Sequence, residues 1–264
     1  MFAPSLPLSL GALIGVVLSG GFVWWEVGRY ATPQVPASLF DERRELFAYT
    51  AGLFVGVPLA IAYVLYIVSM VSLALLGGLV FLALLVVGTE IAQWGLLRTH
   101  FWGSDESGPF YALGYRVAIG GIIVLALASE YFAGPSITPT GIALVVLDSC
   151  AVVGLEAAGA LLSTRSRPGS GRVGGGPVSG AIFGAVGFFL LGLGAATGGA
   201  VAFGAAIVAL FGAVLVYHRL RPILAAIPAP TAGPPAERPR TTTPYARTDR
   251  PLASSEQPGN RDER

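Results

Sequence analysis

The sequence LFAYTAGLFVGVPLAIAYVLYIVSMVSLALLGGLVFLALLVVGT, residues Leu46 to Thr89, runs for 44 residues without a charged side chain. A helix needs about 20 apolar residues to cross the hydrocarbon core of a bilayer, so this stretch is long enough for two membrane spans. A second uncharged run begins at Val173, ends at His218, and again accommodates two helices. The two runs predict paired transmembrane helices rather than the core of a soluble domain.

The composition of the whole chain agrees with a membrane protein. Of its 264 residues, 54% are hydrophobic and 12% are charged, and the mean hydropathy is +0.71. An average soluble domain is about 25% charged. All 16 basic side chains are arginine. The lack of lysine excludes a retinal or pyridoxal Schiff base and a P-loop phosphate site, and a single cysteine excludes a disulfide within the chain.

Seven spans account for the uncharged stretches most economically, which predicts an all-α polytopic integral membrane protein. The first paired run is expected to turn at Ser69 to Ser72; a break at Gly77-Gly78 is the alternative and would move Glu90 toward the membrane centre. Thr197-Gly198-Gly199 supplies the turn of the second run. The predicted transmembrane domain, residues 1–227, has spans at approximately 6–26, 47–68, 72–96, 111–132, 139–163, 177–196 and 199–219.

The composition changes beyond Ile227. Residues 228–264 are rich in proline, arginine and threonine and hold few large apolar side chains. Such a segment buries too little apolar surface to offset its loss of conformational entropy on folding, so we predict a disordered tail. Because its positive and negative charges nearly balance, we expect no nucleic-acid partner.

The arginines predict the orientation of the chain. With seven spans the loops alternate between two faces, and every arginine falls on the same face. Cytoplasmic loops carry the excess of basic residues, so the N-terminus is predicted outside and the C-terminal tail in the cytoplasm of a cell membrane. All four tryptophans lie at the same predicted boundary. The first span lacks a preceding basic segment and a clear cleavage site, which favours a retained helix over a signal peptide.

Ionisable residues within the predicted spans are the candidate functional residues. A charged side chain at the centre of a transmembrane helix costs about 2.5–3.5 kcal/mol on insertion scales, so each one needs a partner or a function. Glu90, Arg116 and Glu156 come to similar depth, roughly 8–12 Å from the cytoplasmic boundary by helical rise. An arginine between two carboxylates would balance charge and hydrogen bonding there. Asp148 lies deeper, about 12 Å from Glu156 along the same helix, and has no obvious partner.

These residues have two interpretations. In the first they form a structural polar network between helices, with Asp148 protonated, in a non-enzymatic scaffold or accessory membrane subunit. In the second, Asp148 exchanges protons and Glu156 relays them toward the cytoplasm in a small proton- or cation-coupled transporter. The sequence has no nucleophile motif, metal-ligand spacing or cofactor motif, so we expect no enzymatic activity, no metal and no cofactor.

Small residues at four-residue spacing predict close packing between helices. They lie in three of the predicted spans: Gly180 and Gly184; Cys150, Gly154 and Ala158; and Ala205 and Ala209. Such spacing lets two helix backbones approach, either within the chain or across an interface. The expected partners are therefore the lipid bilayer and a second copy of this chain or another membrane subunit.

Overall fold

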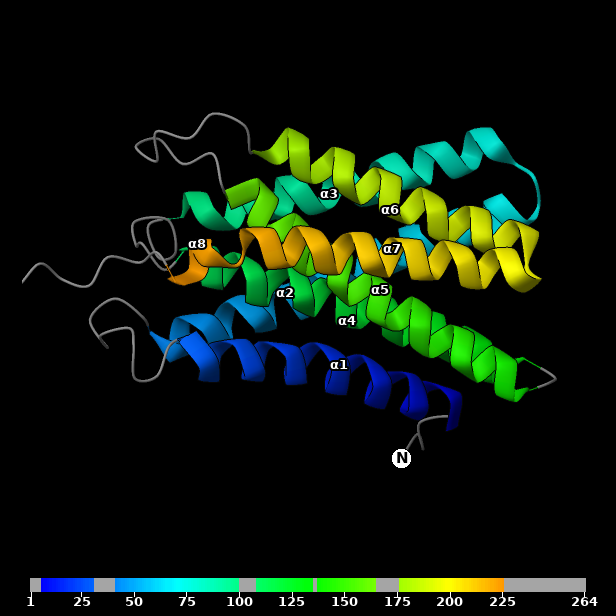
Figure 1. Ribbon diagram of the computed structural model, residues 1–264, viewed down its shortest axis with the longest axis horizontal. Helices are drawn as coiled ribbons and strands as arrows, with labels where there is room; N and C mark the ends of the chain where they lie inside the picture. The colour runs from blue at the N-terminus through cyan, green and yellow to red at the C-terminus, as the bar shows by residue number, and fades with distance from the viewer. Residues whose placement is uncertain (1–5, 31–40, 100–107, 135–136, 165–175, 226–264) are drawn as a thin grey trace, which may run out of the picture. The chain divides into compact units, whose positions relative to one another are not determined.

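The computed structural model describes residues 6–30, 41–99, 108–134, 137–164 and 176–225, which form eight helices and no strand (Figure 1). These helices belong to one compact unit, Met1–Ala229. Seven of them are long and apolar enough to cross a membrane. They are α1 (Leu6–Tyr30), α2 (Glu42–Val71), α3 (Leu75–Arg98), α4 (Gly108–Ala133), α5 (Pro139–Thr164), α6 (Pro177–Thr197) and α7 (Gly199–Leu220), and a single turn, α8 (Pro222–Ala225), follows.

The predicted all-α architecture with seven spans is confirmed. Helix α2 ends at Val71 and α3 begins at Leu75, so the first paired run turns just past the predicted break. The alternative break at Gly77-Gly78 is wrong, because both glycines lie inside α3. The predicted tail, residues 228–264, lies outside the described residues.

The turn between α6 and α7 consists of a single residue. Gly198 and Gly199 have φ angles of 70° and 55°, in the left-handed region that glycine enters without the steric cost of a Cβ atom. Because two consecutive residues take this conformation, α7 begins immediately after α6 ends. The predicted Thr197-Gly198-Gly199 turn is therefore where the chain reverses.

Helix α2 begins five residues before its predicted span, at Glu42 rather than residue 47. The Asp41 side chain caps the helix by accepting a hydrogen bond from the Arg43 backbone N–H at 2.9 Å. The exposed Glu42 lies in the first turn, where negative charge interacts favourably with the helix dipole. Capping thus extends the helix beyond its uncharged part.

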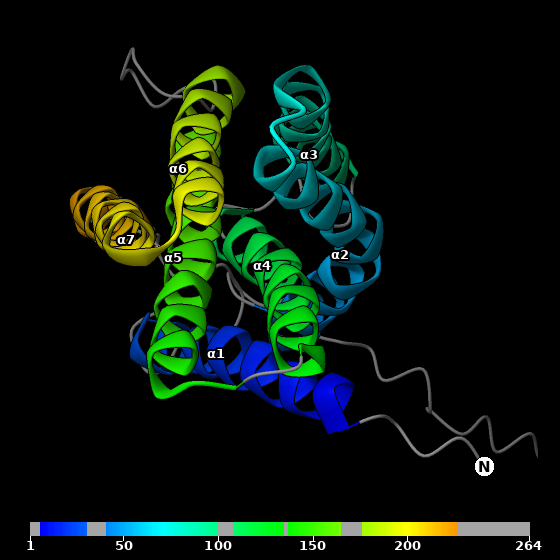
Figure 2. The same ribbon diagram turned by 90° about the vertical axis from the view of Figure 1, so that its right-hand side faces the viewer.

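Helix α4 is the central helix of the bundle. Residues Gly108 through Gly121 are all buried, and α4 packs against α1, α2 and α5, which surround it in Figure 2. The helices around it turn large apolar side chains outward, such as Phe54, Leu76 and Phe211. Extensive exposed apolar surface is typical of a face that meets lipid. The arrangement therefore suits a membrane bundle with α4 shielded from the bilayer.

Glycines bring α1 and α2 close to two different parts of α4. A Cβ atom added to Gly15 of α1 would collide with the carbonyl oxygen of Gly121, and one added to Gly52 of α2 would collide with that of Tyr115. Small residues allow this backbone contact between helices in a bilayer, where packing replaces the hydrophobic effect as the main source of association. Helix α4 is thus held by backbone-to-backbone contact on two sides.

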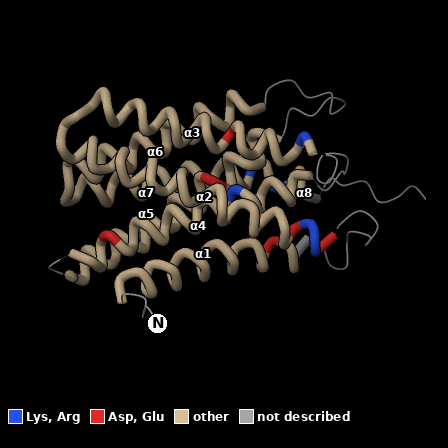
Figure 3. The backbone as a smooth tube through the Cα atoms, turned by 180° about the vertical axis from the view of Figure 1, so that it is seen from behind, with Lys and Arg blue, Asp and Glu red and all other residues tan. Residues whose placement is uncertain are grey.

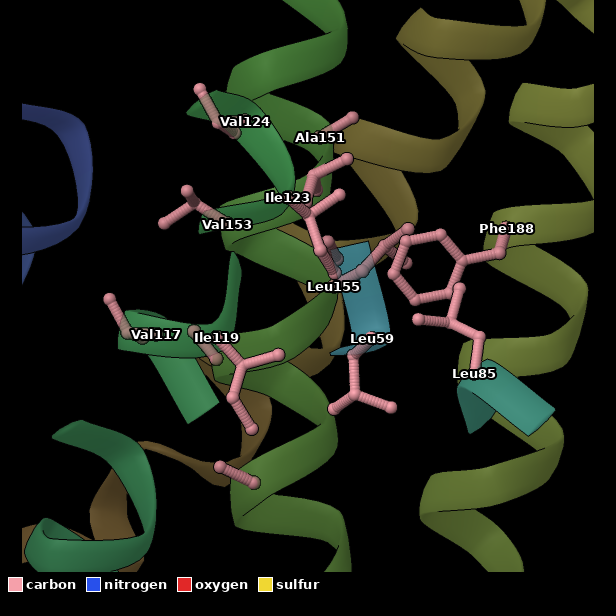
Figure 4. Close-up of a cluster of buried hydrophobic side chains, with 14 of the residues drawn as sticks. Leu59, Leu85, Val117, Ile119, Ile123, Val124, Ala151, Val153, Leu155 and Phe188 are labelled. Atoms are coloured by element: carbon pink, nitrogen blue, oxygen red, sulfur yellow. The ribbon is translucent and has the colours of Figure 1, made fainter. Parts of the chain in front are cut away.

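Apolar side chains fill the interior between the remaining helices. Figure 4 shows Leu59 of α2, Leu85 of α3, Ile123 of α4, Leu155 of α5 and Phe188 of α6 in one cluster. The cluster brings five helices together in one core.

We predict that Gly15→Val destabilises the protein, because the new side chain has to displace the Gly121 backbone. Overpacking of this kind costs about 1–3 kcal/mol, and the melting temperature of the detergent-solubilised protein should fall. Gly21→Val is the matched control, because a Cβ atom at Gly21 of the same helix meets nothing within 4 Å. Equal melting temperatures for the two variants would contradict the close α1–α4 contact.

Candidate functional site

Three of the four candidate residues meet inside the bundle. Glu90 lies eight residues before the end of α3, Arg116 eight residues after the start of α4, and Glu156 eight residues before the end of α5. Because these three helix ends are on the same side of the bundle, each residue lies about 12 Å in from that side. The side chains are nearly completely buried, with exposures of 6%, 2% and 0%.

Arg116 binds both carboxylates. Its Nε donates a hydrogen bond to Oε2 of Glu156 at 2.7 Å, and its Nη1 donates to Oε1 of Glu90 at 2.5 Å. Hydrogen bonds in which one partner is ionised, here the guanidinium, are short and are roughly twice as strong as neutral ones. The guanidinium of the central helix therefore links α3 to α5. We call Glu90, Arg116 and Glu156 the arginine clasp.

Neutral polar groups complete the hydrogen bonding around the clasp. The Ser163 hydroxyl donates to Oε2 of Glu90 at 2.7 Å. The Gln93 side chain accepts from Arg116 Nη1 at 3.3 Å and donates to the Ala160 carbonyl oxygen at 3.3 Å. Gln93 and Glu90 belong to α3 and Ser163 and Ala160 to α5, so two further connections join these helices beside the arginine.

Two glycines make room for the clasp. A Cβ atom at Gly159 of α5 would lie 2.9 Å from Arg116 Nη2. One at Gly180 of α6 would collide with the Ser163 hydroxyl and crowd the Glu90 carboxylate. Gly180 belongs to the small-residue spacing seen in the sequence, and here it packs against other helices of the same chain. The glycine positions thus accommodate polar side chains as well as close helix packing.

Asp148 lies apart from the clasp. It is eight residues before Glu156 on α5, and its carboxylate makes no hydrogen bond or ion pair within the described part of the chain. The positions between the two acids on α5 include Ala151, Val152 and Leu155, all buried and apolar. The structure therefore brings together Glu90, Arg116 and Glu156 and leaves Asp148 separate, half-buried and close enough to Tyr63 of α2 to interact electrostatically.

Sequence reasoning missed two further buried acids. Glu26 of α1 is fully buried, and its Oε1 lies 3.9 Å from Nε of Arg221, which follows α7. Glu45 of α2 is 5% exposed and lies against Gly114 of α4. A signal for the first was present, because Glu26 lies seven residues after Ser19, on the helix face that packs against α4. Glu26 lies at the end of the predicted span 6–26, where an acid is expected to face water, so its burial was not predicted.

The clasp contains no cysteine or histidine, and no cluster of three His, Cys, Asp or Glu residues suited to a metal ion occurs among the residues that the structure describes. No family model matches the chain, and no curated protein or solved structure is detectably similar to it. The class of the protein therefore comes from its fold: seven helices long and apolar enough to cross a membrane indicate a multi-pass membrane protein. Its distinguishing feature within that class is the arginine clasp.

We predict that Arg116→Gln strongly lowers stability, because it removes the cation that the buried Glu90 and Glu156 side chains share. Removing one partner of a buried ion pair costs about 3–5 kcal/mol. Arg116→Lys should lower the stability less than Arg116→Gln does. Lysine keeps the positive charge but loses the planar, two-point hydrogen bonding of arginine. The measurement is thermal unfolding in detergent, with Arg43→Gln, a change of an exposed arginine, as the control. If Arg116→Gln and Arg43→Gln had equal melting temperatures, the clasp would not hold the helices together.

Proposed function

We propose that the chain is a non-enzymatic multi-pass protein of the cell membrane, a scaffold or an accessory subunit of a membrane complex, and that the arginine clasp is structural. The observation that carries this proposal is the pairing of Arg116 with both carboxylates in a closed interior. A residue that binds partners on two neighbouring helices holds those helices in register. Each ionisable group of the clasp is thus used for helix association.

Proton- or cation-coupled transport is the second candidate function. It is favoured by Asp148, an acid in the middle of α5 that has no hydrogen-bond partner within the described residues. An intramembrane acid is a functional-site hypothesis by default. The buried apolar residues between Asp148 and Glu156 weigh against a relay, since proton transfer needs a chain of polar groups or water. The structural role is therefore the better supported of the two.

The proposed partner is another membrane subunit or a second copy of this chain. Several of the small residues named from the sequence pack internally: Gly154 against Ala213, Gly184 against Val86, and Ala205 against Gly194. A partner would therefore contact the large apolar side chains of the outer helix faces rather than these stripes. The rest of that surface would meet lipid.

The proposed orientation places the N-terminus outside and the C-terminal tail in the cytoplasm. Figure 3 shows the arginines gathered toward one end of the helices, and the described helix ends that carry them are those of α1, α2, α3 and α7. Basic residues concentrate on the cytoplasmic side of membrane proteins. The clasp would then lie nearer the cytoplasmic surface.

We predict that cysteine labelling in intact cells distinguishes the two ends. In a Cys150→Ala background, Ser72→Cys and Thr197→Cys place exposed thiols at one end, and Thr99→Cys places one at the other. A membrane-impermeant thiol reagent should label the first two in intact cells and the third only after permeabilisation. The opposite labelling pattern would overturn the orientation.

We predict that Asp148→Asn preserves folding and melting temperature, because a structural, protonated aspartate is nearly isosteric with asparagine. Liposomes containing the wild-type protein should show no pH-driven proton or cation flux above protein-free liposomes. The double variant Asp148→Asn, Glu156→Gln should also keep its melting temperature and show no flux above protein-free liposomes. A wild-type flux that the folded Asp148→Asn variant loses would instead establish transport and overturn the structural proposal.

A further inference from the structure

The arginine clasp carries unequal formal charge. One guanidinium faces two carboxyl groups, and all three side chains are buried. Within the described residues, neither Glu90 nor Glu156 pairs with any other cation. With both carboxyl groups ionised, the clasp would hold one uncompensated negative charge in an apolar interior. A buried ion without compensation is far more costly than a buried neutral polar group, so one positive charge has to be bound here.

The two carboxyl groups differ in their hydrogen bonding. Both oxygens of Glu90 accept hydrogen bonds, Oε1 from Arg116 and Oε2 from Ser163. In Glu156, Oε2 accepts from Arg116, whereas Oε1 is buried and has no hydrogen-bond partner. An ionised carboxylate accepts hydrogen bonds at both oxygens, and only Glu90 has a donor at each. The arrangement therefore fits an ionised Glu90 and a neutral Glu156.

We propose that the clasp is a one-proton binding site, with the proton on Oε1 of Glu156. A hydronium ion of the solvent gives its proton to the Glu156 carboxylate, which becomes a carboxylic acid, and leaves as water; Oε2 continues to accept the hydrogen bond from Arg116 Nε. The clasp then contains one cation, Arg116, and one anion, Glu90, and has no net charge. This inference rests on the proposed structural role of the clasp and gives that role a chemical requirement, a stably bound proton.

A proton fits this site and a metal cation does not. Ions such as Ca²⁺ and Mg²⁺ need six or more oxygen ligands, and Glu156 Oε1 is the one clasp carboxyl oxygen left without a partner. The α4 backbone is also close on this side, since a Cβ atom at Gly120 would lie 3.3 Å from Glu156 Cγ. A proton needs no such coordination shell.

The surrounding helices supply no second cation. Around Glu156, α4 contributes Arg116 and Tyr115, and α3 contributes Glu90. Helix α6, which packs against α5, has no ionisable side chain, and the ionisable residues of α7 lie in its last turn. Helix α1 contributes Glu26, whose ion-pair partner is Arg221. Arg116 is thus the cation that both clasp acids share.

The test is infrared spectroscopy of the full-length protein, labelled with ¹³C-glutamate and reconstituted in lipid at neutral pH. A protonated glutamate gives a carboxylic-acid carbonyl band that shifts with the label and in D₂O. Glu156→Gln should abolish one such band and leave the melting temperature nearly unchanged, because glutamine reproduces the shape and neutrality of the protonated acid. The matched control is Glu45→Gln, the same change at another buried glutamate, which should retain the Glu156 band.

A third variant separates the proposal from simple burial of an acid. In Glu90→Gln, Glu156 becomes the sole counter-ion of Arg116 and should ionise, so its band should disappear although Glu156 is intact. Persistence of the band in that variant would overturn the proposal, as would a wild-type spectrum without any protonated-glutamate band. These two readouts remain decisive even where Glu156→Gln does not fold. If the wild-type protein has both acids ionised and Arg116→Gln still destabilises it, the proton-binding proposal is wrong. The structural role of the clasp is then still supported.

Discussion

A guanidinium group in the interior of an apolar helix bundle has to be paired, and this constraint organises the protein. Arg116 lies on the central helix, and its two glutamate partners join α3 and α5 to α4 at one depth. The cost of leaving any member unpaired is several kcal/mol, comparable to the net stability of a typical domain. Arrangements of α3, α4 and α5 in which Arg116 has no carboxyl partner are therefore much less stable than the observed one.

Glycine packing and the clasp depend on each other. Helices α1 and α2 approach α4 so closely that a Cβ atom at Gly15 or Gly52 would meet the α4 backbone. This packing covers α4, and Arg116 is only 2% exposed. Burial away from water in turn strengthens the attraction between Arg116 and its carboxyl partners. Uncharged glycines on α1 and α2 thus support the pairing of ionisable side chains from α3, α4 and α5.

The sequence predicts much of the fold and part of the site. Uncharged runs are long enough to define seven helices, and helical rise alone puts Glu90, Arg116 and Glu156 at one depth, where the structure has them in contact. The central position of α4 was not predictable, because core-facing and lipid-facing side chains are both apolar and leave no amphipathic pattern. Glu26 and Glu45 were missed because acids near helix ends normally face water, and their burial depends on which helices pack there.

The order of the clasp residues along the chain has a consequence for biosynthesis. Glu90 precedes Arg116 by 26 residues, and Glu156 follows Arg116 by 40. When α4 leaves the ribosome and enters the bilayer, one counter-ion of its arginine is already in place on α3 and the other has not been synthesised. An arginine within a membrane helix opposes insertion, by up to about 2.5–3.5 kcal/mol at the helix centre. We therefore expect α4 to insert beside α3, with α5 completing the clasp once it has been synthesised.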